Sequence, residues 1–425
     1  MDIHGIVRPA LLYGSIVWAH RAQNEDSKKK LGRLQRLALL LIAPVRPSTP
    51  TAALEIIYDV KPLHLVVWEQ ALKSAIRIGI NPGWVPKDTK GHQHLLHEAL
   101  PEQIRGLKCD NMSTDVMLTQ NYEVIITKKG NDISRREWAC YTDGSKVGDE
   151  SGSGGVILHN NLEFKHISYS IGGGTVFQAE VSAILKSAEI LTSIGVSNSN
   201  IDILVDSQAA LKSLKNPITV SDLVRNTKHA LNRLGKQNDL KLHYIKAHVG
   251  WQYNEVADKN ANDGRNAEGI PENIPAPSRT SVYSIIEEIT TEKWVSSWES
   301  SEDYRQSKFF LSGPSKSRSQ LILQNNREAL GHLIRFITGH AFLKRQNAVV
   351  FHGISPPPGD VTCRLCEDPF SEETPHHLIT ECDALCHWRA ETLGGYVLDE
   401  FPEWDPRNLV QFIRHKEIIL LETDD

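Results

Sequence analysis

The stretch Tyr141-Thr-Asp-Gly-Ser-Lys146 places Asp143 directly after an apolar segment, Trp138–Thr142, that is typical of a buried β-strand. Three more apolar segments of strand length follow in the chain, and three segments with helical periodicity accompany them. The expected strands are Trp138–Thr142, Gly155–Leu158, Ile201–Val205 and Leu240–Ile245, and the expected helices are Ala179–Thr192, Ser207–Leu214 and Ser221–Gly235. Strands first and then strand–helix alternation predict an α/β domain.

Each of four expected elements in this domain carries one acidic residue at an unusual position. Asp143 ends the first strand, and Asp206 ends the strand Ile201–Val205. Glu180 lies at the start of a helix, one turn before Ile184 on its apolar side. Asp258 lies in the segment that should begin the last helix of the domain. Active sites gather at the carboxyl ends of strands in open α/β sheets, so these acids are candidate site residues.

Any one of these acids could simply be a helix N-cap, or a first-turn residue whose negative charge the helix dipole favours. Four of them together, with no basic partner evident, would repel one another unless cations neutralise them. Carboxylate oxygens suit Mg²⁺ or Mn²⁺. Two such ions about 4 Å apart can activate a water molecule and stabilise the leaving oxygen of a phosphodiester.

Five successive motifs resemble the signatures of type 1 ribonuclease H, in order, over about residues 138–264. They are Tyr141-Thr-Asp-Gly-Ser-Lys146, Gly152-Ser-Gly-Gly-Val156, Phe177-Gln-Ala-Glu-Val-Ser-Ala-Ile184, Val205-Asp-Ser-Gln-Ala-Ala-Leu211 and His248-Val-Gly-Trp-Gln-Tyr-Asn-Glu-Val-Ala-Asp258. The resemblance implies a ribonuclease H-like mixed sheet with flanking helices. It also implies a metal-dependent endonuclease that cuts the RNA strand of an RNA–DNA hybrid.

The resemblance implies the role of each site residue as well. Asp143, Glu180, Asp206 and Asp258 would bind two Mg²⁺ ions, for which Mn²⁺ could substitute. His248 occupies the family's histidine position on a mobile loop, where it would assist water activation or product departure. The partner would be an RNA–DNA hybrid, recognised by its shape and 2′-hydroxyl groups rather than by its base sequence.

Basic residues in the expected nuclease domain are sparse. No dense Lys/Arg block interrupts residues 214–240, and Arg225, Lys228, Arg233 and Lys236 are spread along one expected helix. This pattern predicts modest affinity for the hybrid without help from other domains.

Four of the six cysteines fall within 24 residues near the carboxyl end of the chain, a spacing typical of a metal site rather than a disulfide scaffold. The series Cys363-x2-Cys366-x10-His377-x4-Cys382 predicts a structural Zn²⁺ site with four ligands. His376 is an alternative to His377, and Cys386 is an alternative to Cys382; His377 is preferred because it gives the His-x4-Cys step of small zinc knuckles. The alternative interpretation, without a metal, is that these cysteines are small buried hydrophobic residues.

The sequences on both sides of the domain resemble parts of non-LTR retrotransposon polyproteins. Arg8-Pro-Ala-Leu-Leu-Tyr-Gly14 to Trp18, Leu34-Gln35-Arg36 and Thr51-Ala-Ala-Leu54 resemble the thumb and connection of their reverse transcriptase. Thr338-Gly-His340 to Cys366 and Glu373-Thr-Pro-His-His-Leu378 resemble the tail that follows their ribonuclease H. The polymerase's catalytic acids have no match, so the resemblance implies a truncated product with a nuclease and no polymerase.

These patterns divide the chain into seven segments. They are a helical segment at 1–80, a connector at 81–135 with a strand expected near Tyr122–Thr127, the nuclease domain at 136–266, a linker at 267–281, a helical segment at 282–355, a zinc-knuckle-like region at 356–390 and an acidic tail at 391–425. Residues 1–80 hold 11 Lys+Arg against 6 Asp+Glu, and residues 352–425 hold 5 against 16. Because the net charge of the chain is −5, any contacts with phosphate groups must come from local basic patches and not from the field of the whole molecule.

The chain is expected to be soluble and intracellular, with nucleus and cytoplasm left open. Its start lacks the features of a signal peptide, and the apolar run Leu37–Ala43 is too short to span a bilayer, so no membrane partner is expected. Protein partners are not predicted.

Two other functions compete with an active hybrid nuclease. One is a catalytically idle nucleic-acid-binding or assembly remnant, which the intact acids disfavour. The other is a proofreading exonuclease of the same superfold, which would need an Asp-x-Glu pair where this chain has Asp143-x-Ser145.

Overall fold

The computed structural model describes residues 8–79, 109–126, 137–246, 252–267, 274–352, 361–366, 368–398 and 405–423. The chain divides into two compact units, one formed by residues 1–72 with 287–425 and the other by residues 73–286. Among the described helices, none is long and apolar enough to cross a membrane.

The unit of residues 73–286 is built on a six-stranded mixed sheet with the strand order β2-β8-β6-β3-β4-β5. Its strands are β2 (Glu123–Ile125), β3 (Trp138–Val147), β4 (Glu150–His159), β5 (Leu162–Gly172), β6 (Asn200–Val205) and β8 (Asp239–Tyr244). β3, β4 and β5 form an antiparallel meander, whereas β6 and β8 run parallel to β3 and β2 runs parallel to β8. The expected α/β domain with a mixed sheet is confirmed.

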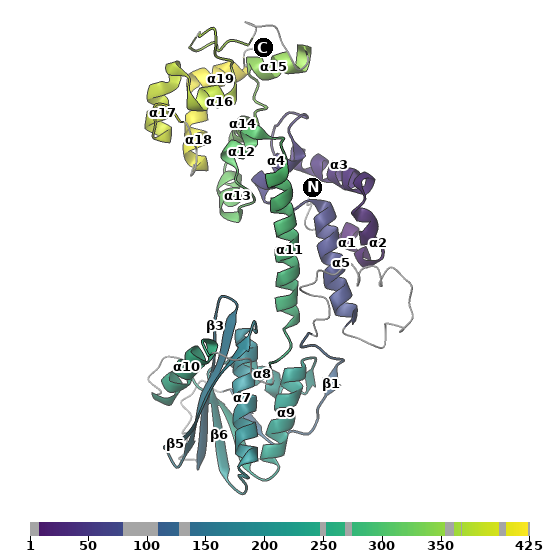
Figure 1. Ribbon diagram of the computed structural model, residues 1–425, viewed down its shortest axis with the longest axis vertical. Coiled ribbons are helices and arrows are strands. Elements are labelled where there is room, and N and C mark those ends of the chain that lie inside the picture. The colour runs from purple at the N-terminus through teal and green to yellow at the C-terminus, as the bar shows by residue number, and fades with distance from the viewer. Residues whose placement is uncertain are drawn as a thin grey trace. The chain divides into compact units, whose positions relative to one another are not determined.

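Helices cover both faces of this sheet (Figure 1). They are α7 (Val176–Ser193), α8 (Gln208–Lys215), α9 (Asp222–Gly235) and α10 (Gln252–Arg265). Because side chains alternate along a strand, Ile203 packs with α7, α8 and α9, while its neighbour Leu204 packs with Tyr141 and Ala257 of α10. The two cores therefore fix the register of β6, and with it the place of Asp206 at the strand's end.

Part of the connector predicted at 81–135 belongs to this sheet unit. β2 lies within the strand expected near Tyr122–Thr127 and pairs with β8. The short strand β1 (Asp115–Val116) pairs with β7 (Ile218–Thr219), between α8 and α9. A side chain at Gly235 would collide with the carbonyl oxygen of Asn121, so the segment before β2 lies directly against the end of α9.

Asp110 attaches the same connector to two helices. Its carboxylate accepts hydrogen bonds from the backbone N–H of Leu223 (3.0 Å), the hydroxyl of Ser221 (2.8 Å) and the amide of Gln178 (3.4 Å). The Asp110 carboxylate also lies against the N-terminal end of α9, where the helix dipole favours a negative charge. Asp110 is therefore a stabilising contact that the sequence motifs do not reveal.

We expect Asp110→Ala to lower the free energy of unfolding by about 1–3 kcal/mol, because it removes a charged acceptor from three donors. The measurement is the urea midpoint of the transition that reports on the sheet unit. Asp149→Ala, on the exposed turn between β3 and β4, is the matched control and should change the midpoint little. Equal midpoints for the two variants would contradict the assigned role of Asp110.

The other unit is helical and joins both ends of the chain in one hydrophobic core. Buried residues from the N-terminal side, such as Leu39 and Ile57, belong to the same core as Phe336 and Phe412. Its helices are α1 (Arg8–Leu12), α2 (Ser15–Ala22), α3 (Glu25–Leu40), α4 (Thr51–Tyr58), α5 (Leu63–Gly79), α11 (Arg279–Ser300), α12 (Arg305–Phe310), α13 (Lys316–Leu323), α14 (Arg327–Thr338), α15 (Lys344–His352), α16 (Pro375–Thr380), α17 (Cys386–Leu393), α18 (Pro406–Ile413) and α19 (Lys416–Thr423), of which α5 and α11 continue into the sheet unit. The helical N-terminal segment is thus confirmed.

The segment expected to be an acidic tail, 391–425, differs from that expectation. It contains α18 and α19, whose residues Leu409, Phe412 and Ile418 are buried in the helical core. These helices pack into the core through an apolar stripe, which was not recognised in the sequence because acidic residues are in excess there.

Glu55 of α4 is buried in this unit, and burial raises the pKa of its carboxyl to about 8. The unfolded chain therefore ionises Glu55 near pH 4.5 while the folded chain keeps it neutral, so stability is lost as the pH rises from about 4.5 to 8. We expect Glu55→Gln to gain on the order of 3–4 kcal/mol over the wild type at pH 8 relative to pH 5. Urea midpoints at the two pH values measure this gain, and parallel pH profiles of the two proteins would contradict it.

Candidate active site

Three of the four acids singled out in the sequence come together at one end of the sheet. Asp143 lies on β3, Glu180 in the first turns of α7, and Asp206 directly after β6. One carboxylate oxygen from each residue lies within 4.8 Å of the others. Three acids that are far apart in the chain therefore form one cluster of oxygen ligands.

The local sequence explains this approach. A Cβ atom at Gly144 would lie 2.6 Å from the backbone nitrogen of Glu180, so only glycine lets β3 pass this close to α7. Thr175 and Gln178 form a capping box that fixes the start of α7, with the Thr175 hydroxyl accepting from the Gln178 N–H at 3.2 Å. The Ser207 side chain caps α8 by accepting a hydrogen bond from the N–H of Ala210. This cap fixes the start of α8 directly after β6, so Asp206 lies in the turn between the strand and the helix.

The cluster is electrostatically unfavourable by itself. Burial, followed by the charge of Asp206, raises the pKa of Asp143. Burial, followed by the charges of Asp143 and Asp206, raises the pKa of Glu180. Oε2 of Glu180 is buried and has no hydrogen-bond partner among the described residues. A divalent cation would relieve both the repulsion and the unsatisfied oxygen.

Asp258 lies on α10 near the three clustered acids but outside their 4.8 Å group. Its charge contributes to the raised pKa of Asp143, and its Oδ1 accepts a hydrogen bond from the Asn262 amide at 3.1 Å. α10 can pack closely against β4 because the residue of β4 that it covers is Gly154. A side chain at this position would collide with the backbone of Ala261. The remaining predicted residue, His248, lies outside the described residues.

Comparison with known protein families agrees with this geometry. The sequence model of the RNase H family matches residues 135–266.

Residues 135–266 form an RNase H domain.

Solved structures similar to the chain include three RNase H proteins, each with a TM-score of 0.26. RNase H1 from Halobacterium salinarum NRC-1 is 23% identical, and the match covers 30% of this chain and 97% of that one. The N-terminal RNase H domain of rv2228c from Mycobacterium tuberculosis is 18% identical, with coverage of 30% and 98%. LC11-RNase H1, isolated from compost, is 19% identical, with coverage of 30% and 96%. No curated protein sequence matches the chain significantly.

The structure changes the expected use of the basic residues on α9 of the RNase H domain. Lys228 is buried, its ammonium group donates to the carbonyl of Asn216, and burial lowers its pKa. Arg225 pairs with Asp222 at 2.7 Å. Of the four cations predicted to lie along this helix, Arg233 and Lys236 have exposed side chains, and Lys236 directly follows the last residue of α9. The helix therefore presents fewer cations than the sequence suggests.

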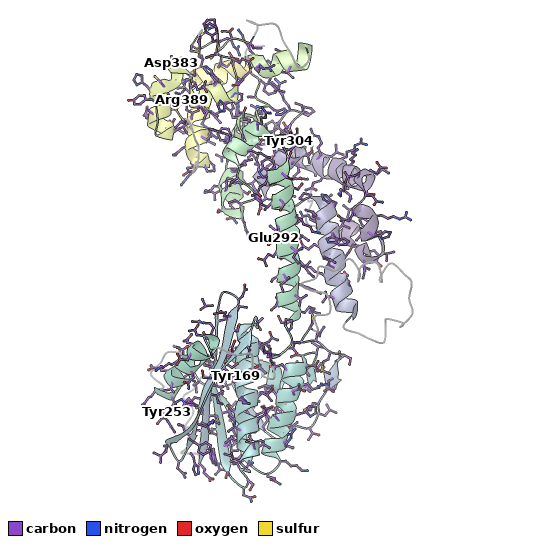
Figure 2. All side chains as sticks on the ribbon, in the orientation of Figure 1. Tyr169, Tyr253, Glu292, Tyr304, Asp383 and Arg389 are labelled. Atoms are coloured by element: carbon purple, nitrogen blue, oxygen red, sulfur yellow. The ribbon has the colours of Figure 1, made fainter. Side chains whose placement is uncertain are left out.

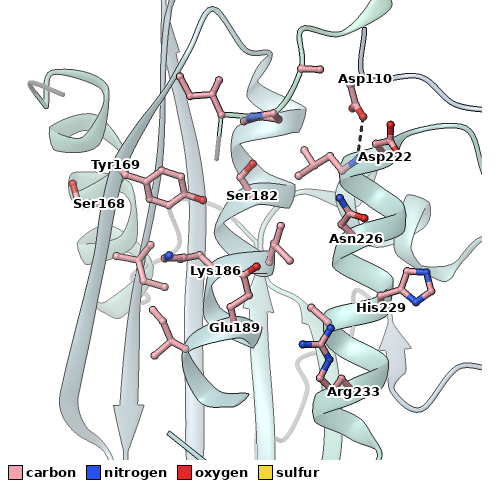
Figure 3. Close-up of a pocket in the computed structure, with 18 of the residues that line it drawn as sticks. Asp110, Ser168, Tyr169, Ser182, Lys186, Glu189, Asp222, Asn226, His229 and Arg233 are labelled. Atoms are coloured by element: carbon pink, nitrogen blue, oxygen red, sulfur yellow. Dashed lines mark hydrogen bonds between the residues drawn. The ribbon is translucent and has the colours of Figure 1, made fainter. Parts of the chain in front are cut away.

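A cavity of about 1110 Å³ in the sheet unit lies apart from the four acids. β5, α7, α9 and residues 274–276 line it. Lys186 and Glu189 of α7 and Arg233 of α9 are among its lining residues, as Figure 3 shows. Because acidic and basic groups share this wall, its charge does not favour a phosphate backbone.

Several polar residues lie beside the acids and were not among the site residues predicted from the sequence. Asn254 donates to Oδ2 of Asp206 at 3.3 Å, and Ser145 donates to Oδ1 of Asn262 at 2.6 Å. Asn254, Asp258 and Asn262 follow one another at four-residue steps on α10, a spacing that places them on one face of a helix. This periodicity is the signal by which they could have been found.

A second cluster lies in the helical unit, outside the RNase H domain. Cys363, Cys366, His377 and Cys382 each offer one ligand atom within 4.8 Å of the others. The Sγ atoms of Cys363 and Cys382 are 4.0 Å apart, and Sγ of Cys366 lies 3.3 Å from Nε2 of His377. A hydrogen bond from Cys382 lowers the pKa of the Cys363 thiol, which favours the thiolate form that binds metals.

The two alternative ligands lie elsewhere. His376 packs edge-on against the ring of Phe309, with the ring centroids 5.2 Å apart, and Cys386 begins α17 outside the cluster. His377 directs Nε2 to the sulfur atoms, while its Nδ1 lies 3.8 Å from the carboxylate of Glu381. An acid beside the other ring nitrogen is a common arrangement around metal-bound histidine.

Buried charged residues support this second cluster. Arg389, labelled in Figure 2, is fully buried and donates to the carbonyl of Cys382 at 2.6 Å. Glu373 is also buried and binds the Arg364 guanidinium at 2.7 and 2.9 Å, which fixes the turn between Cys363 and Cys366. The four potential ligands are therefore held in place by the surrounding fold.

Proposed function

We propose that the RNase H domain hydrolyses the RNA strand of RNA–DNA hybrids at internal positions, with two divalent cations at the acidic cluster. The observation that carries this proposal is the meeting of Asp143, Glu180 and Asp206 within 4.8 Å inside a domain of the RNase H family. Asp258, close by on α10, is the proposed fourth ligand residue.

The donor set fits Mg²⁺ or Mn²⁺. All four side chains offer hard carboxylate oxygens, which these cations prefer over the nitrogen and sulfur ligands of zinc sites. Two ions at such a site supply the charge that activates a water molecule and stabilises the leaving oxygen of a phosphodiester. The protein's part is to hold the four carboxylates in place, and β3, α7, β6 and α10 each position one of them.

His248 keeps the role that the family resemblance implies, assistance with water activation or product departure. The expected substrate preference follows from the same resemblance, with recognition through shape and 2′-hydroxyl groups. Because α9 presents Arg233 and Lys236 rather than four free cations, we expect this domain to bind the hybrid modestly and with a shallow salt dependence.

We also propose that Cys363, Cys366, His377 and Cys382 bind one structural Zn²⁺. Three thiolates and one imidazole are a common closed zinc set, and a closed set leaves no open position for catalysis. The resemblance of the flanking segments supports an origin in a non-LTR retrotransposon polyprotein, with the helical unit related to its thumb, connection and tail.

A panel of substrates of one sequence tests the hybrid activity. Purified full-length chain in Mg²⁺ should cut an RNA–DNA hybrid and leave double-stranded DNA, double-stranded RNA and single-stranded RNA essentially intact. Equal cleavage of the RNA duplex would replace the proposal with a less selective ribonuclease. Binding to the hybrid without any cleavage would favour the idle, nucleic-acid-binding alternative.

A further inference from the structure

Two asparagines on α10 contact the acidic residues of the site. The Asn254 amide donates to Oδ2 of Asp206 at 3.3 Å, and the Asn262 amide donates to Oδ1 of Asp258 at 3.1 Å. A carboxylate only accepts hydrogen bonds when ionised, so each amide must direct its NH₂ group to the acid. One helix therefore places a neutral donor on each of two different carboxylates.

Asn254 is the more deeply buried of the pair, with 5% of its surface exposed. Its Oδ1 is buried without a hydrogen-bond partner among the described residues. Leaving a buried carbonyl oxygen unsatisfied is unfavourable, so packing alone does not explain an asparagine here. A donor that arrives with the cations, such as a water molecule, could satisfy this oxygen.

Asn262 is itself fixed by a short chain of hydrogen bonds. Its Oδ1 accepts from the hydroxyl of Ser145 at 2.6 Å, and that hydroxyl accepts from the Arg265 guanidinium at 3.3 Å. Ser145 lies two residues after Asp143 on β3. The chain thus connects the strand that carries one acid to the helix that carries another.

We propose that Asn254 and Asn262 are positioning residues for the cation site, which orient Asp206 and Asp258 without neutralising them. A lysine or arginine in either place would fix the same oxygen but would add a positive charge that competes with the cations. An amide supplies the hydrogen bond and leaves the full negative charge for the ions. This inference rests on the proposed function, because it assumes that the acids bind divalent cations.

The test measures Mg²⁺ binding without any nuclease assay. Titration of Mg²⁺ into metal-free full-length protein, followed by the melting temperature of the RNase H domain, gives a midpoint for each variant. We expect Asn254→Ala and Asn262→Ala each to raise the Mg²⁺ midpoint roughly 10- to 100-fold, the usual cost of losing a hydrogen bond behind a metal ligand. Hybrid cleavage should fall at limiting Mg²⁺ and recover when Mg²⁺ is raised to saturation.

Asn260→Ala is the matched control, because Asn260 lies on the same helix but donates to the carbonyl of Gly155 instead of to an acid. Its midpoint should equal that of the wild type. Melting in EDTA reports the fold separately, and should Asn254→Ala fail to fold, Asn262→Ala decides the test. Midpoints in both variants equal to the control would overturn the positioning role. A wild type that neither binds Mg²⁺ nor cleaves the hybrid would instead overturn the proposed function.

Discussion

Asp143→Asn is expected to lower hybrid cleavage by roughly a thousandfold or more at any Mg²⁺ concentration. The change removes one charged oxygen ligand from a site that must hold two cations, and ion stabilisation of the transition state amounts to several kcal/mol. The measurement is the initial rate of RNA-strand cleavage in a labelled hybrid. Asp149→Asn, on an exposed turn of the same domain, is the control and should cleave like the wild type.

The same variant should be at least as stable as the wild type when metal is removed. Burial and the nearby Asp206 raise the pKa of Asp143 in the folded chain, so the unfolded chain loses this proton at a lower pH. The wild type consequently loses stability as the pH rises above about 3.9, the ordinary pKa of aspartate, and the neutral asparagine avoids that loss. A variant that melts well below the wild type in EDTA at pH 7.5 would show damage to the fold rather than loss of a metal ligand.

Removal of zinc is expected to unfold the region around α16 and α17. Structural zinc supplies apparent binding energies of about 10–16 kcal/mol in small zinc domains, more than the whole stability of many domains. Cys382→Ser should therefore lower the zinc content from one ion per chain toward zero and should abolish cooperative melting of this region. Metal analysis of protein purified under reducing conditions, together with thermal melting, measures both effects.

Two comparisons sharpen the zinc prediction. Cys386→Ser and His376→Ala change the residues that lie outside the cluster, so both should retain one zinc per chain. Hybrid cleavage with excess Mg²⁺ should largely survive zinc removal, because the acidic cluster belongs to the other unit of the chain. Wild-type protein without zinc, or a zinc content that depends on His376 and not on His377, would contradict the ligand assignment.

The sequence identified the sheet and the acids of the RNase H domain because each motif combines a local pattern with a chemical requirement. Asp143 and Asp206 each follow an apolar segment, and the parallel pairing of those segments, from Trp138 with Ile201 to Thr142 with Val205, brings both acids to the same end of the sheet. Gly144 and Gly154 belong to the quoted motifs, but their role depends on how closely α7 and α10 approach the sheet. Only the structure supplies that distance.

Contacts between distant segments were harder to predict. Asp110 and β2 lie in a segment rich in mixed polar residues, and nothing in their local pattern shows that they bind α9 and β8. Lys228 was predicted to be one of the exposed cations along α9. In the structure it is buried, and its ammonium group donates to the carbonyl of Asn216. Such pairings depend on tertiary structure, which periodicity along one helix or strand does not encode.

The zinc-knuckle-like region illustrates the same limit. Its spacing predicted four ligands within a separate segment, residues 356–390. In the structure Cys363, Cys382 and Leu378 lie in the same core as Leu39 and Phe412. The cluster therefore belongs to a larger helical unit, because residues at the two ends of the chain complete its hydrophobic surroundings.

Cleavage of a hybrid with a separate label on each strand distinguishes an active hybrid nuclease from the alternative functions. Full-length protein is incubated with an RNA–DNA hybrid that carries different labels on its two strands, in Mg²⁺ and in EDTA. We expect internal cleavage of the RNA strand in Mg²⁺, an intact DNA strand, and no cleavage in EDTA. An RNA strand left intact in both Mg²⁺ and Mn²⁺ by protein that melts cooperatively, or a DNA strand cut as fast as the RNA, would contradict it.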